Sequence, residues 1–423
     1  MPKIPELLAP AGDIDKLKVA LDYGADAVYL GGEMFGLRAQ AGNFNLEQLR
    51  CAIAETHARN KKLYLTLNAY LPQNQMHVLD SYLEELRALN IDAYIVSDPG
   101  VLSRVKTVDP HRELHLSTQA NTMNAAACTF WQQQGVERVN LGRELTLEDI
   151  RAIRQNTSTD LEVFVHGAMC IAYSGRCLLS TAMTGRSANS GACAQPCRWN
   201  YALVEETRPN QAFGIEEDAA GTYIMNSRDL CLLEHIPDLI ASGVDSLKIE
   251  GRMKTLYYVA TVTRVYRAAI DAIKACGADP EHYQCDPLWR TELDKVSHRP
   301  YTTTFLSSDN AAVHSEDSRY RRSHDFLGIV RERRSATEFL VEGRNRFRCG
   351  DTIEVIGPNM RQTEVVVEDA RTQTNEPCAV IQPNARVWLH LPAGSQVGDM
   401  LRCEKPTHQH WSITPAASVK EVR

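Results

Sequence analysis

The chain has 423 residues, of which 43% are hydrophobic and 23% charged, and its formal net charge is −7. This composition excludes an extensively disordered chain and predicts two or three domains, of which an α/β barrel can use about 250 residues by itself. The first residues show no charged leader before an apolar core, and no stretch reaches about 18 apolar residues. We therefore expect a cytoplasmic protein without a signal peptide or membrane helix.

Short apolar segments alternate with amphipathic ones along the first 280 residues. Four of them share one layout, in which Gly or Asn ends a helix and a mainly apolar run follows: GADAVYLGG, NIDAYIVSD, GVERVNLGR and GVDSLKIEG. The predicted strands begin near Glu6, Ala27, Lys62, Ala93, Glu113, Arg138, Leu161 and Ser246. Eight strands that alternate with helices predict a TIM-like (β/α)8 barrel over residues 1–280. The rival, an open doubly wound sheet, is disfavoured because no glycine-rich phosphate turn follows the first strand.

Polar side chains follow many of these strands, at the end where barrels build their active sites. Arginines, a lysine and amides at such a position suit an anionic, carboxylate-bearing ligand. The candidate small-molecule pocket consists of Arg38, Asn68, His115, Gln119 and Arg143. The candidate catalytic residues are His166, Lys248, Glu250 and Arg252. The alternative is that these side chains only cap helices or form ion pairs, and His166 could also be a metal ligand or a structural hydrogen-bonding group.

An insertion after the seventh strand, residues 168–226, is far longer than a usual βα loop. It holds four cysteines with the spacing C-x6-C-x15-C-x3-C, namely Cys170, Cys177, Cys193 and Cys197. Thiolates brought together repel one another unless a metal centre binds them. Zinc knuckles pair cysteines two to four residues apart, which only the last pair does, so an iron–sulfur centre is favoured over zinc. Cys231, which we expect at the start of a helix, is an alternative fourth ligand.

The remainder of the chain changes character. Residues 281–325 read as a connecting segment without helical period, and residues 326–405 as short alternating strands separated by turns. The latter pattern predicts a small β-barrel domain, followed by a tail over residues 406–423. Candidate nucleic-acid-binding residues are Arg319, Arg321, Arg322, Arg331, Arg333 and Arg334. A local basic surface can bind phosphates in an acidic protein, although interleaved acidic residues also fit a solvated, ion-paired face.

The segment EVFVHGAMCIAYSGRCLLS closely resembles the signature of the collagenase-like peptidase family, whose catalytic type is unassigned. GACAQPCRW, MNSRDLC and SLKIEGRMKT, with ELLAPAG and GADAVYLGG near the start, also resemble hallmarks of this family, over about residues 5–405. The layout is similar to its tRNA hydroxylation branch. That resemblance implies oxygen-independent hydroxylation of wobble uridine to 5-hydroxyuridine, linked to prephenate and to a [4Fe-4S] cluster on Cys170, Cys177, Cys193 and Cys197. Some relatives instead use a cysteine that matches Cys231.

We therefore expect a tRNA uridine hydroxylation enzyme with an iron–sulfur cluster, prephenate as co-substrate and tRNA as partner. One alternative is a peptidase, for which the chain offers neither an HExxH helix nor a GxSxG elbow. A Cys170–His166 nucleophile pair would serve a peptidase, but a cysteine that ligates a cluster is not a free nucleophile. The other alternative is a non-catalytic iron–sulfur or zinc partner subunit.

Overall fold

The computed structural model describes residues 3–36, 43–169, 177–186, 188, 192–196, 228–277, 282–303, 306 and 320–405, with the backbone of 217–218 and 221–222. The chain divides into two compact units. The first comprises Met1–Arg322 with Ile356–Gln362, and the second Ser323–Val355 with Thr363–Arg423. The second unit begins close to the predicted boundary, whereas the predicted connecting segment belongs almost entirely to the first unit.

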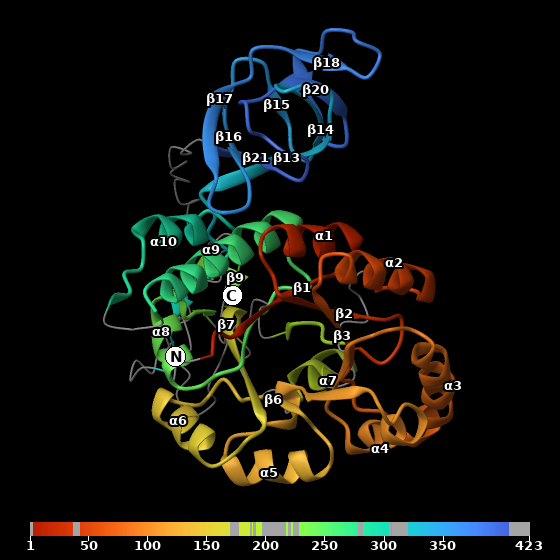
Figure 1. Cartoon of the computed structure of the whole chain (residues 1–423). Helices are drawn as coiled ribbons and strands as arrows, with labels where there is room; N and C mark the ends of the chain where they lie inside the picture. Colours follow the sequence, from red (N-terminus) through yellow and green to blue (C-terminus); the bar gives the residue numbers. More distant parts are fainter. Residues whose placement is uncertain are drawn as a thin grey trace, which may run out of the picture. The chain divides into compact units, whose positions relative to one another are not determined.

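The first unit contains a closed barrel of eight parallel strands (Figure 1). The strands are β1 (Glu6–Pro10), β2 (Ala27–Gly31), β3 (Lys62–Leu67), β4 (Ala93–Val96), β5 (Glu113–Leu116), β6 (Arg138–Asn140), β7 (Asp160–Ala168) and β11 (Ser246–Ile249). Strand β11 pairs with both β1 and β7, and these two pairings close the barrel. The predicted (β/α)8 fold is confirmed, and each strand starts within one residue of its predicted position.

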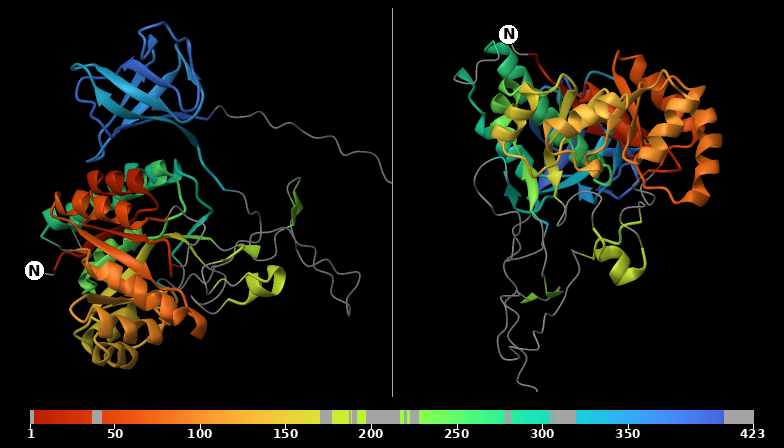
Figure 2. Two further views of the ribbon diagram at one scale, coloured as in Figure 1. Left: turned by 90° about the vertical axis from the view of Figure 1, so that its right-hand side faces the viewer. Right: turned by 90° about the horizontal axis from the view of Figure 1, so that it is seen from below.

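Helices surround the strands in the order that the sequence pattern predicts (Figures 1 and 2). They are α1 (Ile14–Asp22), α2 (Leu46–His57), α3 (Met76–Arg87), α4 (Pro99–Val108), α5 (Ala125–Gln133), α6 (Leu147–Gln155), α8 (Ile236–Ala241) and α9 (Leu256–Ala275). Side-chain caps set several of their starts: Asn45 and Gln48 form a capping box on α2, and Thr255 accepts from the backbone of Tyr258 on α9. Within the described ranges, every helix is too short or too polar to cross a lipid bilayer.

A buried ion network fills part of the barrel interior. The carboxylate of Glu162 on β7 accepts hydrogen bonds from Lys248 Nζ at 2.7 Å, Asn140 Nδ2 at 2.9 Å and Ser246 Oγ at 3.2 Å. A guanidinium nitrogen of Arg138 lies 3.7 Å from the same carboxylate. Burial by itself would raise the pKa of Glu162, but Lys248 and Arg138 hold it below its ordinary value. Glu162 is therefore ionised and paired inside the barrel.

The chain after β7 departs from the expected pattern in two places. Helix α7 (Leu179–Thr184) lies in the insertion, where β8 (Glu217–Asp218) pairs with β9 (Gly221–Thr222). Cys231 ends the short strand β10 (Asp229–Cys231), which runs antiparallel to β7, so its predicted place at the start of a helix is wrong. The connecting segment contains helix α10 (Pro287–Asp294) and strand β12 (Tyr301–Thr302), which pairs with β10.

Helix α10 begins like many helices, with Asp286 as N-cap and Pro287 in its first turn. Its Glu292 pairs with Arg264 of α9, and both side chains are fully buried. The expectation of a segment without helix overlooked this start signal.

The second unit is all-β, as predicted, and antiparallel in its described pairings. Its main sheet has seven strands in the order β17-β16-β21-β13-β14-β20-β18. These are β13 (His324–Arg333), β14 (Glu338–Gly343), β16 (Thr352–Ile356), β17 (Gln362–Val366), β18 (Ala370–Thr372), β20 (Arg386–His390) and β21 (Met400–Glu404), with the pair β15 (Phe347–Arg348) and β19 (Val380–Ile381) beside it. Its core includes Val330, Phe339, Val341, Val387 and Leu389. The predicted tail 406–423 lies outside the described residues.

Candidate active site

Arg143 and Glu250 meet at the carboxyl ends of their strands, β6 and β11. Arg143 Nη2 lies 3.9 Å from Glu250 Oε2, and Arg143 Nη1 donates to the carbonyl of Ala168 at 3.1 Å. The guanidinium carbon lies 3.9 Å from the ring centroid of Phe164, a cation–π contact. Because the Arg143 side chain is only 11% exposed, these contacts fix a largely desolvated cation at this end of the barrel.

Arg252 supplies a second buried cation at the same end. Its Nη1 donates to Thr66 Oγ1 at 3.2 Å, and its Nη2 donates to Asn43 Oδ1 at 2.8 Å. A Cβ atom added to Gly31, the last residue of β2, would lie 2.6–2.8 Å from three atoms of this guanidinium. Only glycine therefore leaves room for Arg252 in this position. Arg38, predicted to join this pocket, lies outside the described residues.

Amides and hydroxyls connect the ends of β3, β4 and β5. Asn68 Nδ2 donates to Ser117 Oγ at 3.4 Å, and Ser97 Oγ donates to Gln119 Oε1 at 3.3 Å. Gln119 itself is 5% exposed. The structure thus brings Asn68 and Gln119 into one hydrogen-bonded row, as expected of neighbouring strand ends.

Two predicted site residues instead lie in the barrel interior. Lys248 donates to Glu162, and its Nζ lies 4.7 Å from the ring centroid of Tyr29. His115 Nε2 lies 2.7 Å from Glu113 Oε1, and the His115 ring meets Tyr64 edge-on at 4.6 Å. Glu113 is the first residue of β5, so His115 is directed toward the amino end of its strand. Neither side chain belongs to the row at the opposite end.

His166 also lies away from the predicted pocket. The register of β7 against β11 shifts between Lys248 and Ile249, through a β-bulge or a similar irregularity. The ring centroid of His166 lies 5.5 Å from that of Tyr266 and 5.9 Å from that of Tyr258, both on α9, and 5.3 Å from that of Tyr301 on β12. The prediction that His166 converges with the barrel-end residues is wrong, and the register shift lies at the point where its side chain leaves the expected alternation.

The His166 side chain is almost completely buried from solvent. It is 1% exposed, and burial lowers the pKa of His166 to about 3, so the ring is neutral at neutral pH. Nδ1 lies 3.3 Å from the Tyr266 hydroxyl, while Nε2 has no hydrogen-bond partner in the part of the chain that the structure describes. The thiol of Cys231 lies next to this group, 3.9 Å from the Tyr266 hydroxyl and 3.6 Å from Arg290 Nη1.

The described part of the insertion holds two of the four clustered cysteines. Cys177 and Cys193 are half-buried free thiols. The backbone N–H of Gln195 donates to Cys193 Sγ at 3.4 Å, and Ser180 Oγ accepts from the N–H of Ala194 at 2.9 Å. Cys170 and Cys197 lie outside the described residues. Within the described residues, no group of three metal-ligating side chains occurs.

The predicted basic residues are divided between the two units. Arg321 and Arg322 belong to the first, Arg331, Arg333 and Arg334 belong to the second, and Arg319 lies outside the described residues. In the second unit, Arg331 pairs with Glu342 at 2.8 Å and Arg334 with Glu338 at 2.9 Å. Arg333 Nε donates to the carbonyl of Ser335 at 2.8 Å. Acidic side chains thus interleave with the arginines, as the sequence suggested.

Sequence reasoning missed several residues that complete the barrel-end group. Thr66 and Asn43 hold Arg252, Phe164 supports Arg143, and Gly31 leaves space for a guanidinium. The paired glycines that end GADAVYLGG were the available signal for Gly31, because a glycine at a strand end often marks a close approach. The other three were not marked by charge or by an unusual residue type.

Comparison with known proteins identifies relatives of both units. The family model for "Peptidase family U32" matches residues 12–316, and the one for "Peptidase family U32 C-terminal domain" matches residues 322–402. The chain is 42% identical over 371 residues to "tRNA hydroxylation protein P1" of Bacillus subtilis, covering 86% of each chain. It is 35% identical over 322 residues to "23S rRNA 5-hydroxycytidine C2501 synthase" of Escherichia coli, covering 74% of this chain and 47% of that one. It is 31% identical over 383 residues to "Collagenase" of Porphyromonas gingivalis, covering 86% and 90%.

Proposed function

The chain belongs to peptidase family U32, and we propose that within this family it is an RNA-modifying enzyme that hydroxylates uridine in tRNA. The observation that carries this proposal is the 42% identity to a protein named for tRNA hydroxylation, over 86% of both chains. The relative named for rRNA is matched over only 47% of its length. Identity to that relative is also lower, at 35%, so tRNA is the favoured RNA.

Within this proposal, the product is 5-hydroxyuridine at the wobble position and the co-substrate is prephenate, a dicarboxylate. Arg143 and Arg252 support this choice, since guanidinium groups bind carboxylates through paired hydrogen bonds. Both are largely buried, and buried charges bind more strongly than solvated ones. Glu250, which lies 3.9 Å from Arg143, would give up this contact when a carboxylate binds.

A [4Fe-4S] cluster, with zinc as the alternative, would be held by Cys170, Cys177 and Cys193 with Cys197 or Cys231 as the fourth ligand. The fit rests on the half-buried free thiols of Cys177 and Cys193 and on the backbone N–H that the Cys193 sulfur accepts. When bound, such a cluster supplies one-electron redox chemistry. The protein's own part is to hold the thiolates: Ser180 and Arg186 hydrogen-bond to the backbone of Ala194 and Ala192 and so anchor the loop that carries Cys193.

The peptidase reading keeps one supporting observation, the 31% identity to a protein named as a collagenase. A cysteine peptidase needs a histidine that accepts the proton of its nucleophile. His166 is buried against tyrosines, with a pKa lowered to about 3, which makes it a poor base. Cleavage of a collagen peptide that is lost in Cys170→Ala would favour the peptidase over the hydroxylation enzyme.

The substrate is tested by nucleoside mass spectrometry of tRNA from a strain that lacks the gene. We expect loss of 5-hydroxyuridine and its derivatives, and their recovery when the wild-type gene is restored. Unchanged nucleosides in a strain without a second copy of the family would contradict the proposal.

The cluster is tested on protein purified without oxygen. We expect a brown protein whose iron and sulfide are lost in Cys177→Ser and Cys193→Ser, whereas Cys51→Ser, an exposed thiol on α2, keeps both. Iron analysis of Cys197→Ser and Cys231→Ser then identifies the fourth ligand. A colourless wild-type protein with one zinc per chain would contradict the iron–sulfur assignment.

A further inference from the structure

One face of the second unit gathers arginines around a single carboxylate. Glu342 on β14 lies 2.8 Å from Arg331 on β13, 3.0 Å from Arg344 and 3.8 Å from Arg386 on β20. The strand register explains the grouping, because Glu342 stands opposite Arg386 on one side and opposite Ile329 on the other. Three guanidinium groups, from β13, from β20 and from the residue that follows β14, therefore converge on one carboxylate.

An aromatic side chain extends this group along β20. The guanidinium carbon of Arg334 lies 3.7 Å from the ring centroid of Trp388, and Arg371 on β18 stands opposite Trp388 in the register. Trp388 and Arg386 are two residues apart on β20, so they share a face of the sheet. Val387 and Leu389, which alternate with them, belong to the core. Arg386 and Trp388 thus point away from the side of the sheet that holds Val387 and Leu389, and Trp388, which is only 8% exposed, is covered in part by Arg334.

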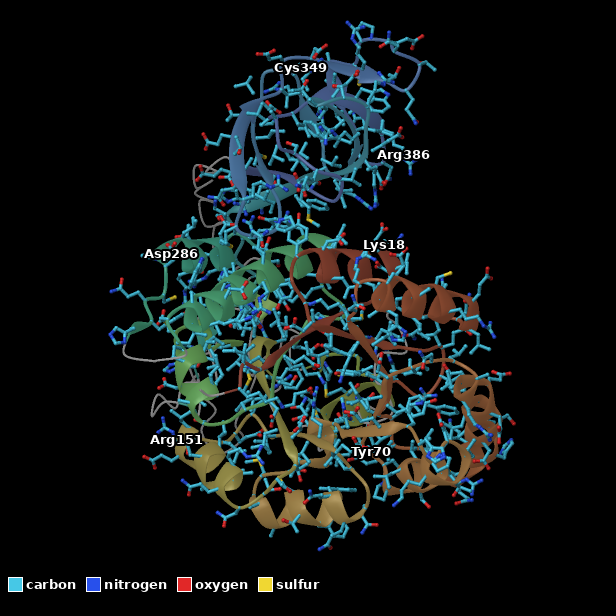
Figure 3. All side chains as sticks on the ribbon, in the orientation of Figure 1. Lys18, Tyr70, Arg151, Asp286, Cys349 and Arg386 are labelled. Atoms are coloured by element: carbon cyan, nitrogen blue, oxygen red, sulfur yellow. The ribbon has the colours of Figure 1, made fainter. Side chains whose placement is uncertain are left out.

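We call this surface the arginine face and define it by Arg331, Arg334, Arg344, Arg371, Arg386 and Trp388. Its arginine side chains are between 25% and 53% exposed, and Figure 3 labels Arg386 at the surface of this unit. Glu342 is only 14% exposed and is shared by three guanidinium groups, so it competes with a phosphate for them.

We propose that the arginine face binds the phosphate backbone of structured RNA, and this inference rests on the proposed function, which supplies tRNA as the partner. The chemistry fits in two ways. Guanidinium forks bind phosphate oxygens in pairs, and an arginine held flat on an indole presents a plane on which a base can stack. Because the chain as a whole has a net charge of −7, its attraction for RNA must come from a local surface of this kind.

This assignment differs from the basic set that the sequence suggested. Arg344, Arg371 and Arg386 join the surface through strand pairing, which the linear sequence does not show. Arg333, which hydrogen-bonds to the carbonyl of Ser335, and the two arginines of the first unit are not part of it. The second unit supplies affinity for RNA, and the barrel supplies the small-molecule site.

The test measures binding of a fluorescent tRNA transcript to the full-length chain at several salt concentrations. The variant Arg331→Gln/Arg344→Gln/Arg386→Gln should raise Kd at least about tenfold and lower the slope of log Kd against log salt by about two to three. The matched control replaces three exposed arginines of barrel helices, Arg50, Arg87 and Arg151, by glutamine. It should change Kd less than about twofold, as expected of residues that contact no phosphate.

A second variant excludes a mere folding defect as the cause. Glu342→Gln removes the carboxylate that competes for three guanidinium groups, so tRNA binding should tighten several-fold. Equal affinity of the triple variant, its control and the wild type would overturn the inference, as would tighter binding of a polyglutamate peptide than of tRNA at this face.

Failure of the proposed function has a different signature. Cys177→Ser should bind tRNA like the wild type while losing the modified nucleoside. If tRNA binds through the arginine face but nucleosides are unchanged in the deletion strain, the proposed function fails and the RNA-binding surface stands.

Discussion

Replacing Lys248 by methionine tests whether this residue stabilises the barrel or takes part in the chemistry. Lys248 Nζ lies 2.7 Å from Glu162 Oε1, and the two side chains are 5% and 2% exposed. Methionine retains an apolar stem near Tyr29 and Phe164 but removes the charge. Glu162 is then left as a buried carboxylate that has lost its shortest ion pair.

The loss in free energy of unfolding depends on the partners that Glu162 retains in Lys248→Met. Removing one partner of a buried ion pair costs about 3–5 kcal/mol. Glu162 retains Arg138 at 3.7 Å and hydrogen bonds from Asn140 and Ser246, so we expect the lower end, about 3 kcal/mol. For a unit of this size that corresponds to a fall in melting temperature of about 4 °C. The double variant Lys248→Met/Glu162→Gln removes both charges and should melt above Lys248→Met alone.

Scanning calorimetry of the full-length chain measures these melting temperatures, and nucleoside analysis of a complemented deletion strain measures function. A structural role predicts that Lys248→Met is destabilised and that the double variant recovers part of both stability and function. A Lys248→Met protein that melts like the wild type but restores no modified nucleoside would refute this reasoning and make Lys248 a catalytic residue.

Three further outcomes follow from the described contacts. Gly31→Ala places a methyl group against the Arg252 guanidinium. The amount of modified nucleoside should therefore fall at least about tenfold, roughly 1.4 kcal/mol, while circular dichroism shows near-normal folding. Wild-type activity of this variant would show that Arg252 needs no fixed position. The pKa of Glu162 is held below 4.5 in the folded chain, so the stability that ionised Glu162 gives the folded chain is present above that pH and is lost on acidification. The melting temperature should therefore fall less between pH 6 and pH 3.5 in Glu162→Gln than in the wild type. Equal falls would contradict an ionised, paired Glu162. Arg264→Met removes a fully buried cation that pairs with Glu292 and leaves Lys295 Nζ at 3.0 Å as a remaining partner, so it should cost about 3 kcal/mol, the lower end for a buried pair. An unchanged calorimetric transition would argue against that pair.

Much of the fold was predictable because one local rule repeats. Strands β2, β4, β6 and β11 are short apolar runs that follow a helix ending in Gly or Asn, and the apolar character of buried parallel strands marks them locally. The second unit was predictable as all-β for a similar reason, since alternation marks its strands. Strand β21 lacks that alternation in MLRCE and is defined by its pairing with β13.

The candidate site was less predictable, because it depends on which way side chains point. A strand pattern places Arg143 and Glu250 at one end of the barrel, and the structure agrees. The same pattern cannot reveal the register shift between β7 and β11 beside His166, nor the carboxylate of Glu162 that binds Lys248 inside the barrel. Both depend on pairing between β7 and β11, whose residues lie more than 80 positions apart along the chain.

The most direct test of hydroxylation is a nucleoside measurement in a deletion strain grown without oxygen and complemented with this chain. We predict that the wild-type gene restores 5-hydroxyuridine derivatives in tRNA, whereas Cys177→Ser restores none and Cys51→Ser restores the wild-type amount. Full restoration by Cys177→Ser, or none by the wild type, would contradict the assignment of this chain as a tRNA hydroxylation enzyme that depends on its clustered cysteines.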